Sequence, residues 1–305
     1  NYVGGWPLNP VFGFGGHPLE RNETMQKTLT KWWWLFTGPT LAAFVIGFAI
    51  PFIMGVYLSF TKFTIITDSK WVGLQNFKAI WGDPVFVHAF WYTALFAVVI
   101  TITVNIAAFF LAYMLVKAFK GKNLFRSVFF MPNLIGGIVL GYIWLVLLNG
   151  VLEPWGKNVV YDSDYAFWAL VLVTFWQQAG YMMVIYIAGL QSIPSDVLEA
   201  AKVDGASSGQ TLRSVILPLV MPSITVCTFL TLSGGFKMFD QNLALTNGAP
   251  GRMSEMLALN IYNTFYGRPG FEGVGQAKAV VFLILVAGVV LVQNWFVRSK
   301  EANDD

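Results

Sequence analysis

Six long apolar stretches, separated by polar segments, dominate the pattern of hydrophobic and polar positions along the chain. They contain no Asp, Glu, Lys or Arg and cover residues 32–61, 85–116, 127–152, 165–195, 214–236 and 279–297. A helix needs about 20 predominantly apolar residues to cross a bilayer, and each stretch is long enough for one crossing. Because the backbone must satisfy its own hydrogen bonds in lipid, each stretch should be helical. The pattern predicts an all-α, polytopic membrane protein with six transmembrane helices.

Composition supports this prediction and excludes several other classes of protein. Only 11% of the 305 residues are charged and 56% are hydrophobic, whereas about 25% of a typical soluble domain is charged. The net charge of +3 is too small for a nucleic-acid-binding surface. Cys227 has no second cysteine to pair with, and His17 and His88 are too far apart for a metal site. We expect no bound metal or cofactor and no nucleic-acid partner.

The charges of the short loops predict which way the chain crosses the membrane. The loop after the second crossing has no acid but four cations, Lys117, Lys120, Lys122 and Arg126. The loop after the third crossing has one cation, Lys157, and three acids, Glu153, Asp162 and Asp164. Cytoplasmic loops are enriched in Lys and Arg, so we expect the former inside and the latter outside. Six crossings then place both termini in the cytoplasm, in a multi-pass protein of the cell membrane.

The same pattern divides the chain into three parts. Residues 1–30 form a cytoplasmic N-terminal arm, 31–298 the six-span domain, and 299–305 a cytoplasmic tail. Within the domain the fourth crossing ends near residue 192, and a polar loop covers 194–218. The arm has no basic segment ahead of an apolar one, so we do not expect it to be a secretory signal.

Small residues and prolines in the apolar stretches predict how the helices pack and bend. Gly137 and Gly141 form a Gly-x-x-x-Gly motif, for which simple helix packing is favoured over a special dimer role. Prolines within or beside the stretches predict kinks or helix starts; they are Pro39, Pro51, Pro132, Pro218 and Pro222. Kinked helices suit a moving transport path better than a static anchor.

The polar loop 194–218 begins with signals for a short helix. Asp196 is followed three residues later by Glu199, a pair that predicts a capping box at the start of this helix. Asp204-Gly205 predicts a turn after it, because Gly tolerates a positive φ angle.

A second helix is predicted in the same loop. Ser207 and Gln210 form another capping pair, which opens a helix that runs into Pro218. In the first helix the small Ala200 and Ala201 leave a flat surface that another protein can approach closely. A solvated amphipathic linker explains these features equally well.

The loop also carries a recognisable motif. Glu199-Ala-Ala-x-x-Asp-Gly-Ala206, followed by Val215-x-Leu-Pro218, resembles the EAA loop of ABC importer permeases. Further resemblances to sugar permeases lie in Val72–Phe77, Arg126-x-x-x-Phe130-x-Pro132 and Phe239–Pro250. From about residue 30 onward the chain is similar to the MalF/UgpA-like carbohydrate permease subunits, the inner membrane components of binding-protein-dependent transport systems. Two places depart from the family pattern, Ala249 in place of a glycine and Gln276-Ala-Lys278 in place of small residues.

The resemblance implies a permease subunit of an ATP-driven sugar importer, and not an enzyme. Its implied partners are a second, MalG/UgpE-like permease subunit, two ATPase subunits that use ATP and Mg, an extracellular sugar-binding protein and membrane lipid. The chain has no Walker A motif of its own. The segment Gly150–Asn158 resembles one, but it has five residues between its glycines and ends in Asn where Ser or Thr is required. The implied ATPase-coupling residues are Glu199, Ala200, Ala201, Asp204, Gly205, Gln210 and Pro218.

Polar side chains of the fourth and fifth crossings are candidates for the substrate path. Sugars are bound by amides, hydroxyls and carboxylates together with aromatic faces, and polar groups in membrane helices point inward or at a cavity. Gln178 and Tyr181 lie three residues apart and share a helix face. A second group, from Ser233 to Asp240, has its polar and aromatic residues at spacings of three and four positions. The candidates, at positions that resemble the sugar contacts of maltose-type permeases, are Gln178, Tyr181, Ser233, Phe236, Lys237 and Asp240.

A polar residue in a crossing can also serve packing between helices instead of binding a substrate. The neighbouring Gln177 is expected to form an interhelical hydrogen bond, and Lys237 and Asp240 could pair with each other as i,i+3 neighbours. Gln178, Lys237 and Asp240 also differ in type from the maltose pattern, which favours a different sugar.

Two other functions stay open from the sequence. An ion-coupled secondary sugar transporter needs an intramembrane ionisable residue, and His88 is the only one in the six stretches. An ABC permease for another small polar solute, such as glycerol 3-phosphate, would need a cation in the path to bind the phosphate. Lys237 is the only candidate for that cation.

Overall fold

The computed structural model describes residues 32–35, 37–117 and 120–304, except for the side chains of 294 and 296–304. The expected arm, 1–30, lies outside the described residues, as do the side chains of the expected tail, 299–305. The chain divides into two compact units, one up to Gly55 and one from Val56 onward.

The first unit contains most of one apolar helix, Thr37–Leu58, which is long enough to cross a membrane. A π-helical turn, η1 (Val45–Ala49), interrupts it before α2 (Ile50–Leu58). Pro51 has no N–H group to continue the hydrogen-bond ladder, which accounts for the altered turn just before it. Phe44, Phe48 and Phe52 stack along one side of this helix, with ring centroids 5.1 and 5.8 Å apart.

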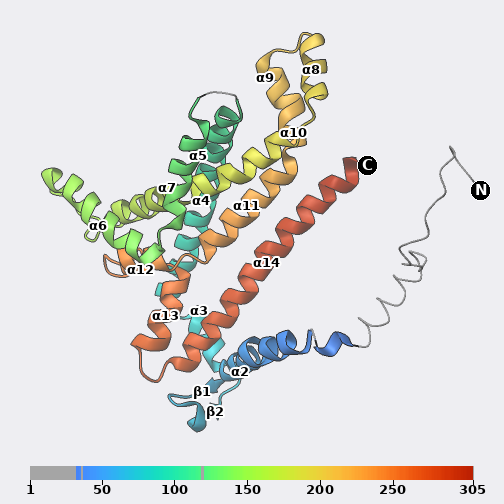
Figure 1. Ribbon diagram of the computed structural model, residues 1–305. Helices are drawn as coiled ribbons and strands as arrows, with labels where there is room; N and C mark the ends of the chain where they lie inside the picture. The colour runs from blue at the N-terminus through green and yellow to red at the C-terminus, as the bar shows by residue number, and fades with distance from the viewer. Residues whose placement is uncertain (1–31, 36, 118–119, 305) are drawn as a thin grey trace, which may run out of the picture. The chain divides into compact units, whose positions relative to one another are not determined.

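The second unit begins with a small hairpin and continues as helices (Figure 1). Antiparallel strands β1 (Thr61–Lys62) and β2 (Lys70–Trp71) flank a 3-10 turn, η2 (Ile66–Asp68). The longer helices are α3 (Gln75–Trp81), α4 (Pro84–Val116), α5 (Lys122–Phe130), α6 (Gly137–Leu152), α7 (Ser163–Gln191), α8 (Ser195–Val203), α11 (Met221–Phe236), α12 (Asp240–Leu245), α13 (Leu257–Gly267) and α14 (Glu272–Asp304). Short turns between them are η3 (Met131–Leu134), η4 (Glu153–Trp155), α9 (Ser208–Thr211), η5 (Leu212–Ile216) and α10 (Leu217–Leu219).

The predicted fold class is confirmed. Among the described residues, five helices are long and apolar enough to cross a membrane, and a bent pair makes up to six. The pair is Ser208–Leu219 with Met221–Phe236, bent by 69°. This bend lies beside Pro218 and Pro222, where kinks were predicted, because proline cannot continue the helical ladder.

Two expected crossings have different bounds in the structure. The stretch 127–152 is not one helix, because α5 ends at Phe130, η3 follows, and α6 begins only at Gly137. Pro132 lies in the first turn of η3 and Ile135 is extended, so the helix is broken between them. At the other end of the chain, α14 begins at Glu272, seven residues before the expected 279.

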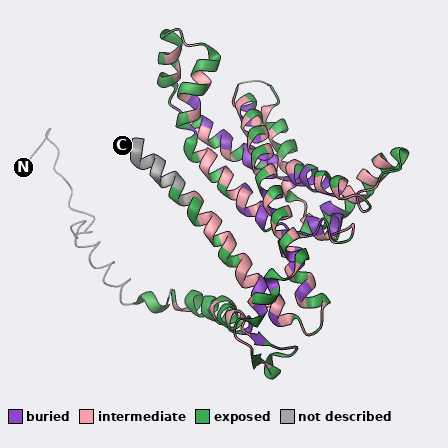
Figure 2. Ribbon diagram, turned by 180° about the vertical axis from the view of Figure 1, so that it is seen from behind, coloured by how far each residue is buried: buried purple, intermediate pink, exposed green. Residues whose placement is uncertain are grey.

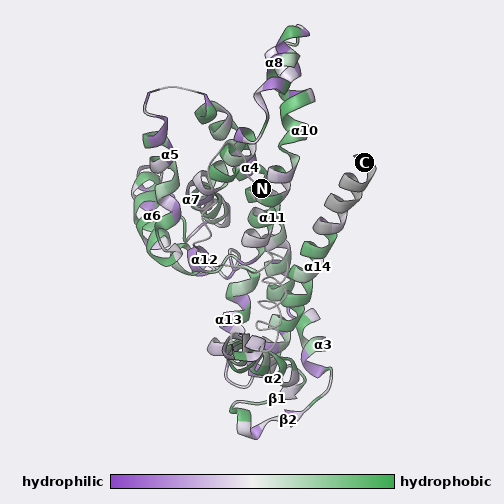
Figure 3. Cartoon of the chain, turned by 45° about the vertical axis from the view of Figure 1, so that its right-hand side comes forward, coloured by the Kyte–Doolittle hydropathy of each residue, from purple (hydrophilic) through white to green (hydrophobic). Residues whose placement is uncertain are grey.

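The main core lies where α4, α7 and α11 pack together, and buried residues gather there in Figure 2. Two hydrogen bonds join the same three helices. Tyr186 Oη donates to Asn105 Oδ1 at 2.7 Å, and Asn105 Nδ2 donates to Thr231 Oγ1 at 2.8 Å. Figure 3 shows mostly apolar residues along α10 and α14 and a more polar α8.

Small residues let several helices approach closely. A Cβ atom at Gly137 would lie 2.7 Å from Cβ of Asp240, and one at Gly141 would lie 2.6 Å from Cβ of Ala244. The Gly-x-x-x-Gly motif therefore packs α6 against α12 within the chain. At Gly180 of α7, a Cβ atom would overlap the backbone carbonyl of Phe129 in α5.

We expect Gly180→Ala to destabilise the folded protein by about 1–3 kcal/mol or more, because the added methyl group meets backbone that cannot rotate away. Thermal unfolding of the purified protein in detergent measures this as a lower Tm. Gly150→Ala is the matched control, since a Cβ atom there meets nothing within 4 Å. Equal Tm values for the two variants would contradict the proposed close packing of α5 on α7.

Candidate functional site

The loop between α7 and α11 folds as two helical segments joined by a tight turn. Gly205 has a φ angle of +76°, as the predicted turn requires. The predicted capping box at Ser207 and Gln210 is confirmed: Gln210 Oε1 accepts from the Ser207 N–H at 2.8 Å, and Ser207 Oγ accepts in return. In Figure 1, α8 and α9 lie at the opposite end of the unit from α3 and α13.

The predicted cap at Asp196 is wrong. The N-cap position of α8 is Pro194, with no side-chain capping bond, and the helix begins at Ser195. Asp196 therefore lies inside the first turn, where its negative charge still interacts favourably with the helix dipole.

Most of the predicted coupling residues are exposed at this end of the molecule. Ala201 is partly buried, and the exposed ones are Glu199, Ala200, Asp204, Gly205, Gln210 and Pro218. Val203 is 87% exposed beside them, while Leu198 and Leu212 pack against the core. The loop is thus anchored on one side by leucines and presents small, charged and apolar residues on the other.

The predicted path residues lie on α7, at the end of α11 and at the start of α12. Gln178 and Tyr181 come from α7, and Nε2 of Gln178 is 3.8 Å from where a Cβ of Gly234 in α11 would lie. The Tyr181 ring, with 38% of the residue exposed, lies 6.4 Å from that of Phe130. Their contact with a substrate stays a prediction.

The other four candidates differ in exposure. Ser233 and Phe236 are buried, and the Ser233 hydroxyl has no hydrogen-bond partner among the described residues. Lys237 and Asp240 are both exposed, and no ion pair in the described part of the chain joins them. The alternative that these two residues simply pair with each other is therefore not what the structure has.

Gln177 forms the interhelical hydrogen bonds expected of it. Its Nε2 donates to the Ile135 carbonyl at 2.9 Å, and its Oε1 accepts from Gln241 Nε2 at 2.5 Å. The break between η3 and α6 removes the Ile135 carbonyl from a helical ladder, so a side chain must satisfy it. Gln177 therefore joins the break in the third crossing to α12.

A buried cluster around Lys278 was missed by the sequence analysis. Lys278 Nζ donates to Asp83 Oδ2 at 2.8 Å, to Asn260 Oδ1 at 2.8 Å and to Thr264 Oγ1 at 2.9 Å. Lys278 is fully buried and lies 5.2 Å from the centre of the Phe86 ring. It fastens the start of α4 and the middle of α13 to α14.

The cluster corrects the statement that His88 is the only ionisable residue in a crossing. Since α14 begins at Glu272, both Glu272 and Lys278 lie in a helix apolar enough to span the membrane. The signal was present in the sequence, as Asn260 and Thr264 are i,i+4 neighbours and Lys278 departs from the family pattern.

Asp83 is the partner of this cluster that lies outside the membrane-spanning helices. Burial alone would raise the pKa of its carboxyl group, but the hydrogen bond and charge of Lys278 and the backbone N–H groups of α4 outweigh it. The net effect is a lowered pKa. Asp83 also caps α4, with Oδ1 accepting from the Val85 N–H at 3.1 Å.

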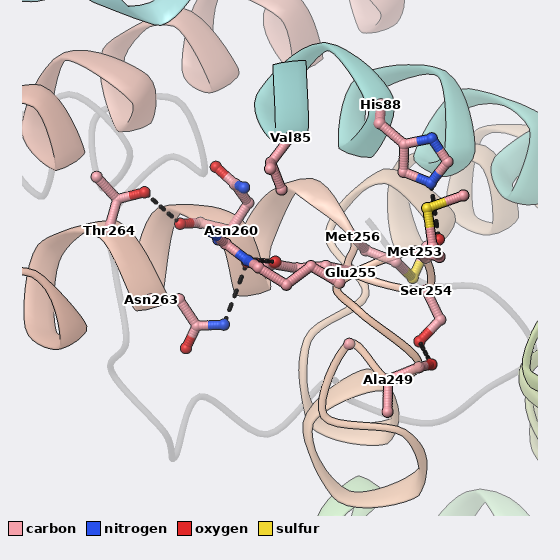
Figure 4. A network of polar contacts seen from close by, with 12 residues as sticks. Val85, His88, Ala249, Met253, Ser254, Glu255, Met256, Asn260, Asn263 and Thr264 are labelled. Atoms are coloured by element: carbon pink, nitrogen blue, oxygen red, sulfur yellow. Dashed lines mark hydrogen bonds and ion pairs between the residues drawn. The ribbon is translucent and has the colours of Figure 1, made fainter. Parts of the chain in front are cut away.

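The segment between α12 and α13 is held by a second polar network (Figure 4). Asn242 Oδ1 accepts from the Met256 N–H at 2.9 Å, and its Nδ2 donates to the Ser254 carbonyl at 2.7 Å. His88 Nε2 lies 2.7 Å from the Met253 carbonyl oxygen. These bonds fix the C-terminal end of the segment 246–256 to α12 and α4.

A buried carboxylate completes this network. Glu255 is fully buried; it accepts from Asn263 Nδ2 at 3.1 Å and pairs with Arg252. The hydrogen bond with Glu255 raises the pKa of the Arg252 guanidinium, which stays charged. Asn247 and Arg252 have positive φ angles of 48° and 68°, a conformation that this network stabilises. No group of three or more His, Cys, Asp or Glu residues in the described chain could hold a metal ion.

Long apolar helices, a protruding two-helix loop and a polar lining near the helix breaks define a membrane permease. The chain belongs to the family of binding-protein-dependent transport system inner membrane components, whose model matches residues 105–301. This confirms the resemblance to ABC importer permeases inferred from the motifs.

Named relatives match nearly the whole chain. It is 41% identical over 278 residues to the probable starch degradation products transport system permease protein AmyD of Thermoanaerobacterium thermosulfurigenes, covering 88% of this chain and 95% of that one. It is 31% identical to the multiple sugar-binding transport system permease protein MsmF of Streptococcus mutans, covering 88% and 97%. The sn-glycerol-3-phosphate permease protein UgpA of Agrobacterium fabrum is 26% identical, covering 88% and 94%.

Solved structures share the fold. A chain of a bacterial ABC transporter that imports the acidic polysaccharide alginate superposes with a TM-score of 0.77 at 19% identity. The match covers 90% of this chain and 99% of that one.

We expect Asp83→Asn to lower the stability of the purified protein at pH 7 on the order of 3 kcal/mol, because Lys278 loses its counter-charge while the α4 cap is kept. The pKa of Asp83 is lowered in the folded state. The ionised Asp83 carboxylate therefore contributes fully to the free energy of unfolding above its pKa in the unfolded state. This contribution is lost as the pH falls through its lower pKa in the folded state.

The measurement is the Tm of both proteins between pH 7 and pH 3, where the gap should narrow below about pH 4. Asp68→Asn is the control, since Asp68 is exposed and joins no ion pair among the described residues. A gap that is constant with pH would show that the charge of Asp83 is not what stabilises the cluster.

Proposed function

We propose that the chain is one of two permease subunits of an ATP-driven importer and forms half of the transmembrane path for a sugar or oligosaccharide. The observation that carries the proposal is the match over 88% of the chain to relatives named for starch degradation products and for multiple sugars. The polar side chains and aromatic rings near the break before α6 and at the end of α11 are the chemistry that would bind a sugar.

The proposed partners follow from the division of labour in such an importer. A second permease subunit completes the path, two ATPase subunits use ATP and Mg, and an extracellular solute-binding protein delivers the sugar. A structural neighbour, the alginate transporter, is described in complex with an alginate-bound periplasmic protein. The loop 194–218 and both termini are then cytoplasmic, in line with the four cations between α4 and α6.

The coupling role is assigned to the exposed side of α8 and the turn after it. Ala200 and Ala201 allow close approach of an ATPase surface, and Glu199 supplies a charge beside them. Val203 and the turn at Gly205 then form the tip. Since Leu198 and Leu212 pack against the core, a displacement of the tip would be passed to the helices.

The substrate path is assigned to Gln178, Tyr181, Ser233, Phe236, Lys237 and Asp240. The unpartnered Ser233 hydroxyl and the exposed Lys237 and Asp240 supply polar groups, while Tyr181 supplies an aromatic face. Glycerol 3-phosphate is a second candidate, supported by the 26% identity to UgpA and by the free cation at Lys237. The higher identity to AmyD favours a sugar.

The experiment that tests the proposal is uptake into proteoliposomes by the chain assembled with its partner permease, ATPases and binding protein. Labelled maltooligosaccharides and glycerol 3-phosphate are compared with and without internal ATP. ATP-dependent uptake of an oligosaccharide is expected. Uptake of glycerol 3-phosphate alone would select the second candidate, and uptake by the chain without ATPases would overturn the proposal.

Gly205→Ala should reduce uptake by about tenfold while the complex continues to hydrolyse ATP, because a residue with a Cβ atom disfavours the φ angle of +76° and distorts the coupling turn. Gly209→Ala is the matched control, as Gly209 lies in the same loop in open space without a positive φ angle. Glu199→Lys should behave like Gly205→Ala. Normal uptake by both Gly205→Ala and Glu199→Lys would remove the coupling role.

Tyr181→Ala should lower the rate of uptake by about tenfold and leave basal ATP hydrolysis unchanged, because it removes an aromatic face from the path and little from the core. Phe110→Ala serves as the control, because Phe110 is an exposed aromatic residue of α4 that is not among the assigned path residues. The measurement is the initial rate of uptake over a range of concentrations of the sugar-loaded binding protein. Equal rates for Tyr181→Ala and wild type would take this residue out of the path.

A further inference from the structure

The connection between α4 and α5 carries a cluster of cations that forms no ion pair with any acid among the described residues. Between Asp83 and Glu153 there is no acidic residue, yet this segment holds four cations, Lys117, Lys120, Lys122 and Arg126. The ion pairs of the described residues involve none of the four. No acidic residue in the described part of the chain compensates this positive charge.

Two of the four cations have roles within the chain. Arg126 Nη2 donates to the Leu115 carbonyl at 3.1 Å and so satisfies a carbonyl of the last turn of α4. Lys117 Nζ lies 5.1 Å from the centre of the Tyr113 ring. Lys120 and Lys122, in contrast, form no hydrogen bond or ion pair with any described residue.

The helix that follows these lysines is fixed in place with an apolar face outward. The Arg126 bond holds α5 against α4, and the close contact of Phe129 with Gly180 holds it against α7. Leu124, Val128 and Met131 lie at i, i+4 and i+7, and they are 68%, 49% and 55% exposed. Such spacing places the three side chains on one stripe.

The stripe continues toward the membrane-spanning part of the chain. Leu134 in η3 is 71% exposed, and Ile138 and Val139 of α6, a helix apolar enough to span the membrane, are exposed as well. Cations at one end of a continuous apolar surface match a phospholipid, with its phosphate at the lysines and its acyl chains along the stripe. A soluble protein partner with acidic residues would explain the lysines but not the continuity of the stripe with α6, a helix apolar enough to span the membrane.

We propose that Lys120, Lys122 and the stripe Leu124–Val128–Met131 bind a phospholipid with an anionic headgroup. The two lysines attract the headgroup and the three apolar residues contact an acyl chain. This inference goes beyond the proposed function, since it holds whatever solute the importer carries.

The test is thermal unfolding of the purified permease complex in detergent, titrated with phosphatidylglycerol or with phosphatidylcholine. Phosphatidylglycerol should raise the Tm of the wild type at lower concentrations than phosphatidylcholine. In the double variant Lys120→Gln/Lys122→Gln, the half-saturating concentration of phosphatidylglycerol should rise roughly tenfold or more, at about 1 kcal/mol for each lysine. Phosphatidylcholine should act equally on both proteins.

The double variant Lys70→Gln/Lys78→Gln is the matched control, because it removes the same charge from two exposed lysines elsewhere. Leu124→Ser/Val128→Ser should weaken the response to both lipids. An unchanged half-saturating concentration in the Lys120/Lys122 variant would overturn the proposal. Loss of an ATPase subunit from that variant with an unchanged lipid response would assign the surface to the ATPase instead. The Tm measurement needs neither ATP nor transport. The lipid proposal can therefore be tested even if the proposed function is wrong.

Discussion

Polar groups inside a membrane have no water to bond with, and the structure of this protein depends on how the chain satisfies them itself. Helices do so along most of each crossing. Where a helix breaks, a side chain from a neighbour takes over, as Gln177 does for the carbonyl of Ile135. Where an ionisable group enters a crossing, as Lys278 does, three oxygen atoms from two other segments surround its ammonium group.

The same constraint explains why the breaks are places of close packing. A break exposes backbone that must be shielded from lipid, and shielding requires a neighbour at short distance. Gly137 and Gly141 admit α12 directly beside the start of α6, and Gly180 admits the end of α5. Small residues and interrupted helices therefore occur together, and the candidate path residues Gln178, Tyr181 and Asp240 lie among them.

The sequence predicted those features that depend on neighbouring residues alone. Apolar length predicted six crossings, and the described residues have five candidate helices, or six if the bent pair is one crossing. The turn at Gly205 and the capping box of Ser207 with Gln210 are as predicted. The cap at Asp196 failed because Pro194, with its fixed φ angle, already starts the helix one residue earlier. A kink or helix start at Pro132 was predicted, but the residues over which the helix is interrupted were not, since the amide that satisfies the freed Ile135 carbonyl lies 42 residues away at Gln177. Lys278 stood out in the sequence as a departure from the family pattern, but its burial against Asp83 could not be predicted, because Asp83 is 195 residues away.

The geometry of α10 and α11 connects the two parts of the candidate site. The loop 194–218 enters α10, the chain bends by 69°, and α11 continues to Ser233 and Phe236. Bending at a proline-flanked joint costs less than bending a regular helix, because Pro218 and Pro222 have no N–H group to donate to the preceding turn. A force on α8 would therefore concentrate its effect at this joint, while the tight contacts of α11 with α4, where Gly235 meets Ala97, resist movement of the far end. Under the proposed coupling, the motion that opens the proposed path would be a change of angle at Val220, and not a displacement of α11 as a rigid rod.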